Sequence, residues 1–263
     1  MNRHARRAAA TSTAPVAPVA TVVPVDFSTV KLCVALSTMR GVHPQCVPWL
    51  VQLGMCITQA GGSFGFLSSS VAHIATARGS LALEFLESDF THFLQIDDDV
   101  AANPADIRRM IERGVSAVGL TYRQKERAEV CYSVRFFGEQ LKQTASDGVV
   151  RAALVPGGCL LLRRDVVEKL RTAHGVYRWG RVSAVGAWLE FVRNGELYAE
   201  DYALSARVRD LGIPMLCELS GRTVHYGVDG TPFEGDFAEY WAGIECQRLA
   251  TGVPGIKQAE APL

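Results

Sequence analysis

Residues 93–100 read FLQIDDDV, an apolar run of the buried-strand type that stops abruptly at three adjacent acids, Asp97, Asp98 and Asp99. A strand cannot bury three ionised carboxylates, because each loses its hydration and repels the others. The strand must therefore end at a place that supplies counter-charge. A solvated loop is the alternative for such a cluster. Oxygen ligands at adjacent positions suit Mg²⁺ or Mn²⁺, which also bind phosphate oxygens, so we favour a metal and phosphate site.

Strand-like and helix-like segments alternate around this run. Buried strands are predicted at 30–36 (VKLCVAL), 91–96 (THFLQI) and 115–120 (VSAVGL), and a further apolar run, SFGFL, begins at Ser63. Helices are predicted over 45–60, 70–88 and from the cap Asn103-Pro104 onward. This alternation predicts an α/β fold in which helices flank a mostly parallel central sheet. Ligands of such sheets bind at the carboxyl ends of the strands, where the three acids and Ser37-Thr38 fall.

The second half of the chain is less regular. Strands are predicted over 130–137, 149–155 and 159–162, with a helix from near Arg164-Asp165. Residues 172–198 show no clean period and are expected to form a long irregular loop. A helix that begins at Glu200-Asp201, a strand IPMLCEL and the segment Val224-His225-Tyr226-Gly227 follow.

Composition limits the class of protein. The 263 residues are 48% hydrophobic, enough for one large domain, and 27 basic residues balance 27 acidic ones, so no overall basic field would hold nucleic acid. Residues 1–26 are rich in Ala and Pro and predict a disordered tail, and 256–263 a second one. The seven scattered cysteines predict reduced thiols, and no apolar stretch approaches the roughly 18 residues of a spanning helix, so we expect a soluble, cytoplasmic protein.

Four segments together resemble a known family. They are IATARGSLALEFLESDFTHFLQIDDDVAANPADI (74–107), VPGGCLLLRRDV (155–166), AEDYALSARVRDLGIP (199–214) and TVHYGVDG (223–230). Their content and order are similar to the nucleotide-sugar glycosyltransferases of the GT-A fold, whose mark is an apolar strand that ends in Asp-x-Asp. The resemblance implies a Rossmann-like GT-A catalytic domain over 27–255, with a nucleotide-binding half (27–120) and an acceptor-binding half (121–255).

The resemblance also implies a metal ion and its ligands. Asp99 is the principal expected ligand of Mn²⁺ or Mg²⁺. Asp97 is expected to be a ligand or a nucleotide contact, and Asp98 a contact to the donor. His225 matches a histidine that completes the coordination in some metal-dependent members. A lone histidine after a strand is otherwise usually structural.

Further positions are implied to bind the donor, a nucleoside-diphosphate sugar with a uridine nucleotide favoured. Arg78 matches a basic residue near the nucleotide or diphosphate; the alternative is an exposed arginine paired with Glu84 or Asp89. Ser37 and Thr38 would lie under the base through backbone groups. Gly157 and Gly158 would let the backbone approach the sugar, unless they form a plain turn.

Glu200 and Asp201 match the acidic pair that lies beside the acceptor hydroxyl, with Asp201 as general base if the enzyme inverts configuration. The alternative is a helix cap at the start of the helix. The aromatic residues Tyr177, Trp179, Trp188 and Phe191 could stack on the apolar faces of an acceptor sugar, and aromatic residues are as often part of the core.

The predicted function is therefore the transfer of a hexosyl or deoxyhexosyl group from a nucleotide sugar to a hydroxyl of a glycan, protein or small molecule. A metal-dependent nucleotidyltransferase or phosphohydrolase is one alternative, because it would also use adjacent aspartates. A catalytically inactive sugar-binding relative is the other. The sugar, the acceptor, the stereochemical outcome and the oligomeric state are left open by the sequence.

Overall fold

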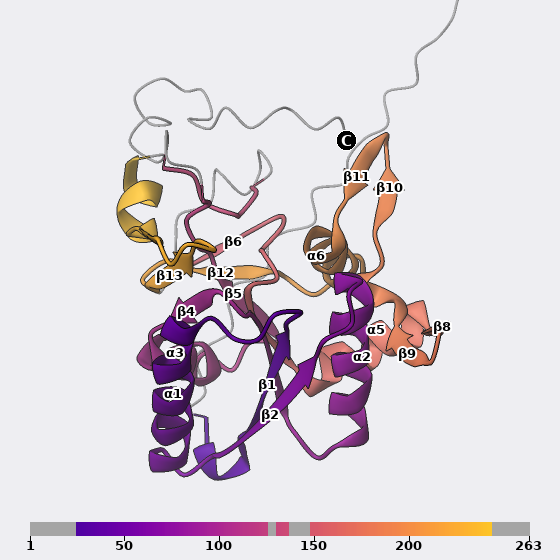
Figure 1. Cartoon of the computed structure of the whole chain (residues 1–263), viewed down its shortest axis with the longest axis horizontal. Coiled ribbons are helices and arrows are strands. Elements are labelled where there is room, and N and C mark those ends of the chain that lie inside the picture. Colours follow the sequence, from indigo (N-terminus) through magenta and orange to yellow (C-terminus); the bar gives the residue numbers. More distant parts are fainter. Residues whose placement is uncertain (1–24, 126–129, 137–147, 244–263) are drawn as a thin grey trace, which may run out of the picture.

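The computed structural model describes residues 25–125, 130–136 and 148–243 (Figure 1). The predicted tails lie outside these ranges, except for residues 25 and 26.

A seven-stranded sheet forms the centre of the described part of the chain, in the spatial order β2, β1, β3, β7, β5, β12, β6. In that order the strands are Ser63–Ser69, Lys31–Ser37, His92–Asp97, Cys159–Arg163, Ala117–Leu120, Leu216–Glu218 and Val149–Arg151. The strands β2, β1 and β3 pair in parallel, as do β5 and β12. In contrast, β7 and β6 run antiparallel to their neighbours. The predicted α/β fold with a mostly parallel sheet is confirmed, with β7 inserted between two parallel groups.

Helices cover both faces of the sheet because the side chains of each strand alternate. In β1, Leu32, Val34 and Leu36 pack against α1 (Val47–Gln59) and α3 (Pro104–Glu112). Cys33 and Ala35 point to the opposite face, which is covered by the helices α2 (Ile74–Glu87), α5 (Arg164–His174) and α6 (Glu200–Asp210). Figure 1 shows these two layers to the left and right of the sheet.

Shorter elements lie beyond the carboxyl ends of the parallel strands and around α6. A three-stranded sheet joins β14 (Pro232–Glu234), β13 (Thr223–Tyr226) and β4 (Val100–Ala102). Two hairpins pair β8 (Val176–Trp179) with β9 (Val182–Val185), and β10 (Phe191–Arg193) with β11 (Glu196–Tyr198). Short 3₁₀ helices occur at Phe27–Thr29 (η1), Pro44–Cys46 (η2) and Gly186–Trp188 (η3), and residues 237–243 are helical.

Two sequence-based predictions are wrong. The expected irregular loop at 172–198 instead contains the two hairpins, the second of which turns at Asn194-Gly195, where both residues have positive φ (54° and 81°). The strand expected at 130–137 is reduced, in its described part, to single bridges from Tyr132 to Arg123 and from Arg135 to Leu154. Neither bridge is extended by a neighbouring pair, so no ladder forms.

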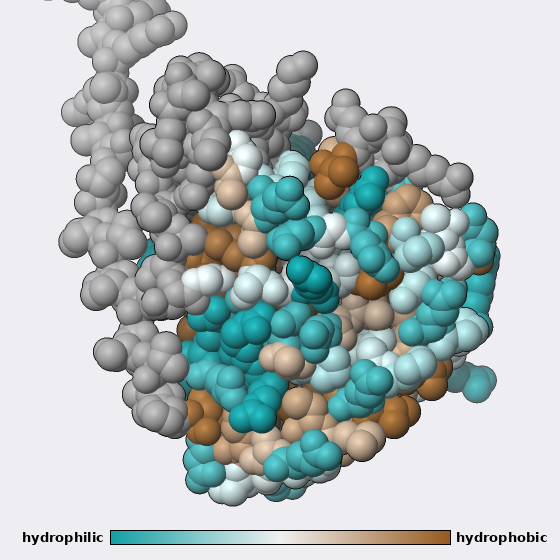
Figure 2. Space-filling model, turned by 90° about the vertical axis from the view of Figure 1, so that its left-hand side faces the viewer, coloured by the Kyte–Doolittle hydropathy of each residue, from teal (hydrophilic) through white to brown (hydrophobic). Residues whose placement is uncertain are grey.

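The side of the molecule that carries α1 and α3 is shown in Figure 2, with a dense hydrophilic cluster and hydrophobic residues in small separate groups. The six described cysteines are free thiols, and four of them are buried. Within the described ranges, none of the helices has the length and apolar character needed to cross a membrane.

Candidate functional site

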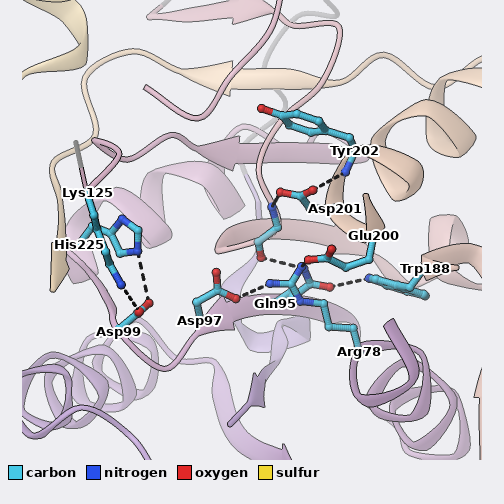
Figure 3. A network of polar contacts seen from close by, with 11 residues as sticks. Arg78, Gln95, Asp97, Asp99, Lys125, Trp188, Glu200, Asp201, Tyr202 and His225 are labelled. Atoms are coloured by element: carbon cyan, nitrogen blue, oxygen red, sulfur yellow. Dashed lines mark hydrogen bonds and ion pairs between the residues drawn. The ribbon is translucent and has the colours of Figure 1, made fainter. Parts of the chain in front are cut away.

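A buried arginine joins the two acidic segments that the sequence singles out. Arg78, on α2, is only 4% exposed, and its Nη1 donates to Glu200 Oε1 at 2.7 Å. Its Nη2 donates to Asp97 Oδ1 at the end of β3. Figure 3 shows the guanidinium between the two carboxylates. The alternative of an exposed Arg78 paired with Glu84 or Asp89 is wrong, since Asp89 instead pairs with Lys31.

The two acids at the start of α6, Glu200 and Asp201, have pKa values raised above those of ordinary carboxyl groups. Burial raises the pKa of Asp201, and the positive charge of Arg78 only partly opposes it. Burial likewise raises the pKa of Glu200 against the influence of Arg78. A buried carboxylate with a raised pKa is a stronger proton acceptor than a solvated one, so Asp201 has the property that a general base needs.

Asp201 is held at the start of α6 by backbone donors. Tyr202 N donates to its Oδ1 at 2.7 Å, and Gly157 N lies 3.5 Å from its Oδ2. The alternative of a helix cap is wrong, because the cap position is Ala199, without a side-chain cap hydrogen bond, and Asp201 lies inside the first turn of α6. The contact with Gly157 ties the acid to the segment before β7.

Gly157 and Gly158 lie against side chains of the site itself. A Cβ at Gly157 would come within 2.4 Å of Gln95 Nε2 and 2.5 Å of Arg78 Nη1. At Gly158 it would lie 2.6 Å from both Asp97 Oδ2 and the Tyr122 hydroxyl. Glycine is needed here because any larger residue would displace the polar groups of the site.

A second polar group lies beside the first, around Asp99 (Figure 3). Lys125 Nζ donates to Asp99 Oδ2 at 2.5 Å, and His225 Nε2 lies 3.5 Å from Asp99 Oδ1. Burial would raise the pKa of Asp99, but the hydrogen bonds from His225 and Lys125 outweigh it and lower the pKa to about 2. The carboxylate is therefore ionised at every physiological pH.

The small sheet explains why His225 meets Asp99. Strand β4 begins directly after the acids and pairs with β13, so that Val100 lies opposite His225. Tyr226 N also donates to the carbonyl of Asp99 at 2.8 Å. Backbone pairing thus fixes the two residues side by side although they are far apart in the sequence.

Asp99 and His225 are the side chains of this second group that could hold a divalent cation. His225 Nδ1 lies 3.1 Å from the carbonyl of Arg123, which can only accept, so Nδ1 carries a proton and Nε2 is the nitrogen directed to Asp99. The ammonium of Lys125 already occupies a cation position on the same carboxylate. Asp97 is directed to Arg78 instead, and no group of three or more acidic, His or Cys side chains is arranged for a metal in the described ranges.

Ser37 and Asp98 lie at the same edge of the sheet. Ser37 pairs in register with Asp97, and its buried Oγ finds no hydrogen-bond partner among the described residues. Thr38 N donates to the carbonyl of Ser69 at 2.9 Å. The carbonyl of Asp98 accepts from His43 N at 2.8 Å, and burial raises the pKa of its carboxyl.

Three site residues were missed by the sequence-based reasoning. Tyr122 is buried beside Asp97, with its ring 4.8 Å from that of His225 in an edge contact, and burial raises the pKa of its hydroxyl far above the ordinary value. Gln95 donates to the carbonyl of Gly157 and accepts from Trp188 Nε1, both at 2.7 Å. Lys125 is the third. The sequence could have indicated two of them: Tyr122 follows the predicted strand 115–120 at its carboxyl end, and Gln95 is a polar residue within an apolar strand.

Comparisons with known proteins give structural neighbours only. No protein-family model matches the chain, and no curated protein does. The structural neighbours include glycosyltransferases and nucleotidyltransferases. Among them are A197 from STIV (18% identity, 78% of this chain and 93% of that chain covered, TM-score 0.49) and UDP-glucose pyrophosphorylase complexed with UDP-glucose (10% identity, 83% and 100% covered, TM-score 0.45). A third is GalNAc-T7 with UDP, GalNAc and Mn²⁺ (11% identity, 88% and 53% covered, TM-score 0.39).

Proposed function

We propose that this protein is a metal-dependent glycosyltransferase that moves a sugar from a nucleoside-diphosphate sugar, with uridine diphosphate as the favoured nucleotide, to a hydroxyl acceptor. The observation that carries the proposal is the Arg78 bridge. It joins the acidic end of β3 to Glu200, next to Asp201, so that the two acidic segments lie together as the family resemblance implies.

The polar group around Asp99 and the polar group around Arg78 would have different roles in such a transfer. Asp99 and His225 would hold Mn²⁺, or Mg²⁺, whose chemistry is to neutralise the charge of the leaving diphosphate. Lys125 and the hydroxyl of Ser37, which has no hydrogen-bond partner within the described ranges, lie on the same edge of the sheet, where the nucleotide is expected. Thr38 and Asp98 belong to this edge as well.

On the other side of Asp97, Asp201 would take the proton of the acceptor hydroxyl if the enzyme inverts configuration. Its raised pKa supports this role. Glu200 and Asp97, both paired with Arg78, would position the reacting groups. The closely approaching backbone at Gly157 and Gly158 would form the floor on which the donor sugar lies.

The chemistry of Arg78 argues against the main alternative. A nucleotidyltransferase or phosphohydrolase with two metals would need a second cation between Asp97 and Glu200. The guanidinium occupies that position. A second cation beside it would be repelled.

The direct test is release of nucleoside diphosphate from a panel of nucleotide sugars with Mn²⁺, with and without candidate acceptors. We expect release with at least one donor, its loss in Asp99→Asn, and retention in Asp89→Asn, whose carboxylate pairs with Lys31 outside the site. Asp201→Asn should still bind the donor and lose most transfer, whereas Asp210→Asn, at the other end of α6, should transfer normally. No release with any donor by a folded protein would refute the proposal and favour a sugar-binding role.

A further inference from the structure

The four aromatic side chains that could face an acceptor, Tyr177, Trp179, Trp188 and Phe191, differ in exposure and in the groups that cover them. Trp188 is fully buried, and its Nε1 donates to Gln95. Phe191 stacks on Tyr198 at 5.0 Å, and the guanidinium of Arg207 lies over the same ring at 4.8 Å. Neither ring has an open face for a ligand.

Trp179 differs from these rings because it is exposed and yet held in place. It lies at the end of β8, is 53% exposed, and stacks on the ring of His73 with centroids 4.7 Å apart and an interplanar angle of 8°. His73 is the one ring that Trp179 contacts in the described part of the chain. The exposure of Trp179 leaves part of its side chain in contact with solvent.

The support under Trp179 is built from buried and hydrogen-bonded groups. His73 Nδ1 and Thr76 Oγ1 are 2.8 Å apart, and Thr76 is fully buried. Tyr177 lies two residues before Trp179 on β8, and its hydroxyl is 2.9 Å from Thr76 Oγ1. His73 Nε2 also lies 3.8 Å from Glu190 Oε2. Such a network fixes the orientation of the ring before any ligand arrives, which lowers the entropy cost of binding.

The stacked pair of Trp179 and His73, called the platform here, shares its elements with the candidate site. His73 is the N-cap residue of α2, and Thr76 precedes Arg78 by two residues on that helix. Glu190 follows Trp188, which binds Gln95 beneath Gly157. The support of Trp179 and the candidate site are therefore built on the same two segments of the chain, α2 and residues 188–190.

We propose that the stacked pair Trp179 and His73, with Glu190 as a hydrogen-bond acceptor beside it, is a subsite for a neutral sugar ring of the acceptor. A pyranose presents a face of C–H groups that packs on an indole and a rim of hydroxyls that donate to a carboxylate. That the ring belongs to the acceptor rests on the proposed function; that the platform binds a sugar does not. The platform makes the acceptor an oligosaccharide or glycoside that extends beyond the hydroxyl that reacts.

Tryptophan fluorescence isolates this site. The other three tryptophans, Trp49, Trp188 and Trp241, are at most 6% exposed, so quenching by acrylamide reports on Trp179. The wild-type protein is applied to an array of immobilised neutral oligosaccharides, and the best-bound sugar is then titrated in solution. We expect protection of Trp179 from acrylamide, and at least about tenfold weaker binding by Trp179→Ala.

The control is Val192→Ala, an even more exposed apolar position in the other hairpin, which should bind the sugar as the wild type does. His73→Ala should weaken binding by a smaller factor, because it removes the support and leaves the ring. Absence of binding on the array, or equal affinity of Trp179→Ala and wild type, would overturn the subsite. Mn²⁺-dependent binding of uridine diphosphate, measured on the same proteins, reports separately on the proposed function and should be unchanged in Trp179→Ala.

Discussion

Arg78 shows how a single buried side chain can hold a site together. The planar guanidinium offers several donors in a fixed fork, so it can bind Asp97 and Glu200 at once, which a lysine ammonium does less well. Burial would lower the pKa of Arg78, but the surrounding carboxylates Asp97, Glu200 and Asp201 raise it instead. The residue stays charged, and the acids stay in place.

Replacing Arg78 should cost stability. In Arg78→Met the carboxylates of Asp97 and Glu200 lose their buried partner, and we expect the free energy of unfolding to fall by about 3–5 kcal/mol in urea titrations. Arg108→Met, which breaks an exposed pair with Glu112 on α3, should change the free energy of unfolding far less. Adding Glu200→Gln to Arg78→Met should restore part of the loss. Equal effects of the two arginine variants would contradict a buried bridge.

The ionised form of Asp201, which the proposed reaction needs, should lower the free energy of unfolding. Its pKa is raised on folding, so the folded protein binds this proton more tightly than the unfolded chain does. As the pH rises from the ordinary carboxyl value through the raised pKa, Asp201 therefore removes stability. We expect Asp201→Asn to unfold at an equal or higher temperature at pH 7 while losing transfer.

The same shift sets the pH dependence of turnover. A base must be ionised, so the acidic limb of the kcat/KM profile, which reports on the free enzyme, should lie above the ordinary carboxyl pKa of 3.8. A profile that stays flat down to this value would argue against Asp201 as the base, and so would normal turnover of Asp201→Asn.

At the scale of elements, the antiparallel strand β7 brings the glycines to the site. Asp97 N donates to the carbonyl of Gly158 at 3.1 Å, so the end of β3 and the start of β7 lie side by side. This leaves no room for a side chain at Gly158.

Gly158→Ala should therefore damage the site more than the fold. The new methyl group would push Asp97 and Tyr122 apart, with an expected loss of about 1–3 kcal/mol in stability and of most activity. Gly243→Ala, where a Cβ meets no atom within 4 Å, should leave both unchanged. Thermal unfolding and diphosphate release measure the two effects. An active Gly158→Ala protein would show that this close packing has no role in the reaction.

The elements that the sequence predicted best are those with long apolar patterns. The strands at 31–37 and 92–97 were predicted to within one residue, because burial on one or both faces dictates their residues. The helix after β3 begins at Pro104 as predicted, whereas the helix before it begins at Ile74, later than the predicted start at residue 70. The hairpin β10–β11 was missed although Asn194-Gly195 is a strong turn signal between its short strands. Strand β4 has three residues and owes its existence to pairing with β13, which no local pattern encodes.

At the scale of the whole molecule, the order of strands decides which residues meet. The strand that ends in acids predicted a ligand site at Asp97 and Asp99, and the family resemblance implied that Glu200, Asp201 and His225 join it. The structure gathers these residues into two adjoining polar groups (Figure 3). The sequence could not reveal that Asp97 pairs with Arg78 while Asp99 pairs with Lys125 and His225. Those partnerships depend on contacts between distant segments, and the antiparallel insertion of β7 is equally non-local.

The most direct measurement is a crystal structure of the protein soaked with Mn²⁺ and uridine diphosphate. The account predicts an ion bound by the Asp99 carboxylate and His225 Nε2, with the diphosphate on the same ion, Lys125 moved from Asp99 toward a phosphate, and Arg78 still between Asp97 and Glu200. An ion held instead by Glu200 and Asp201, or a nucleotide bound away from this edge of the sheet, would contradict it.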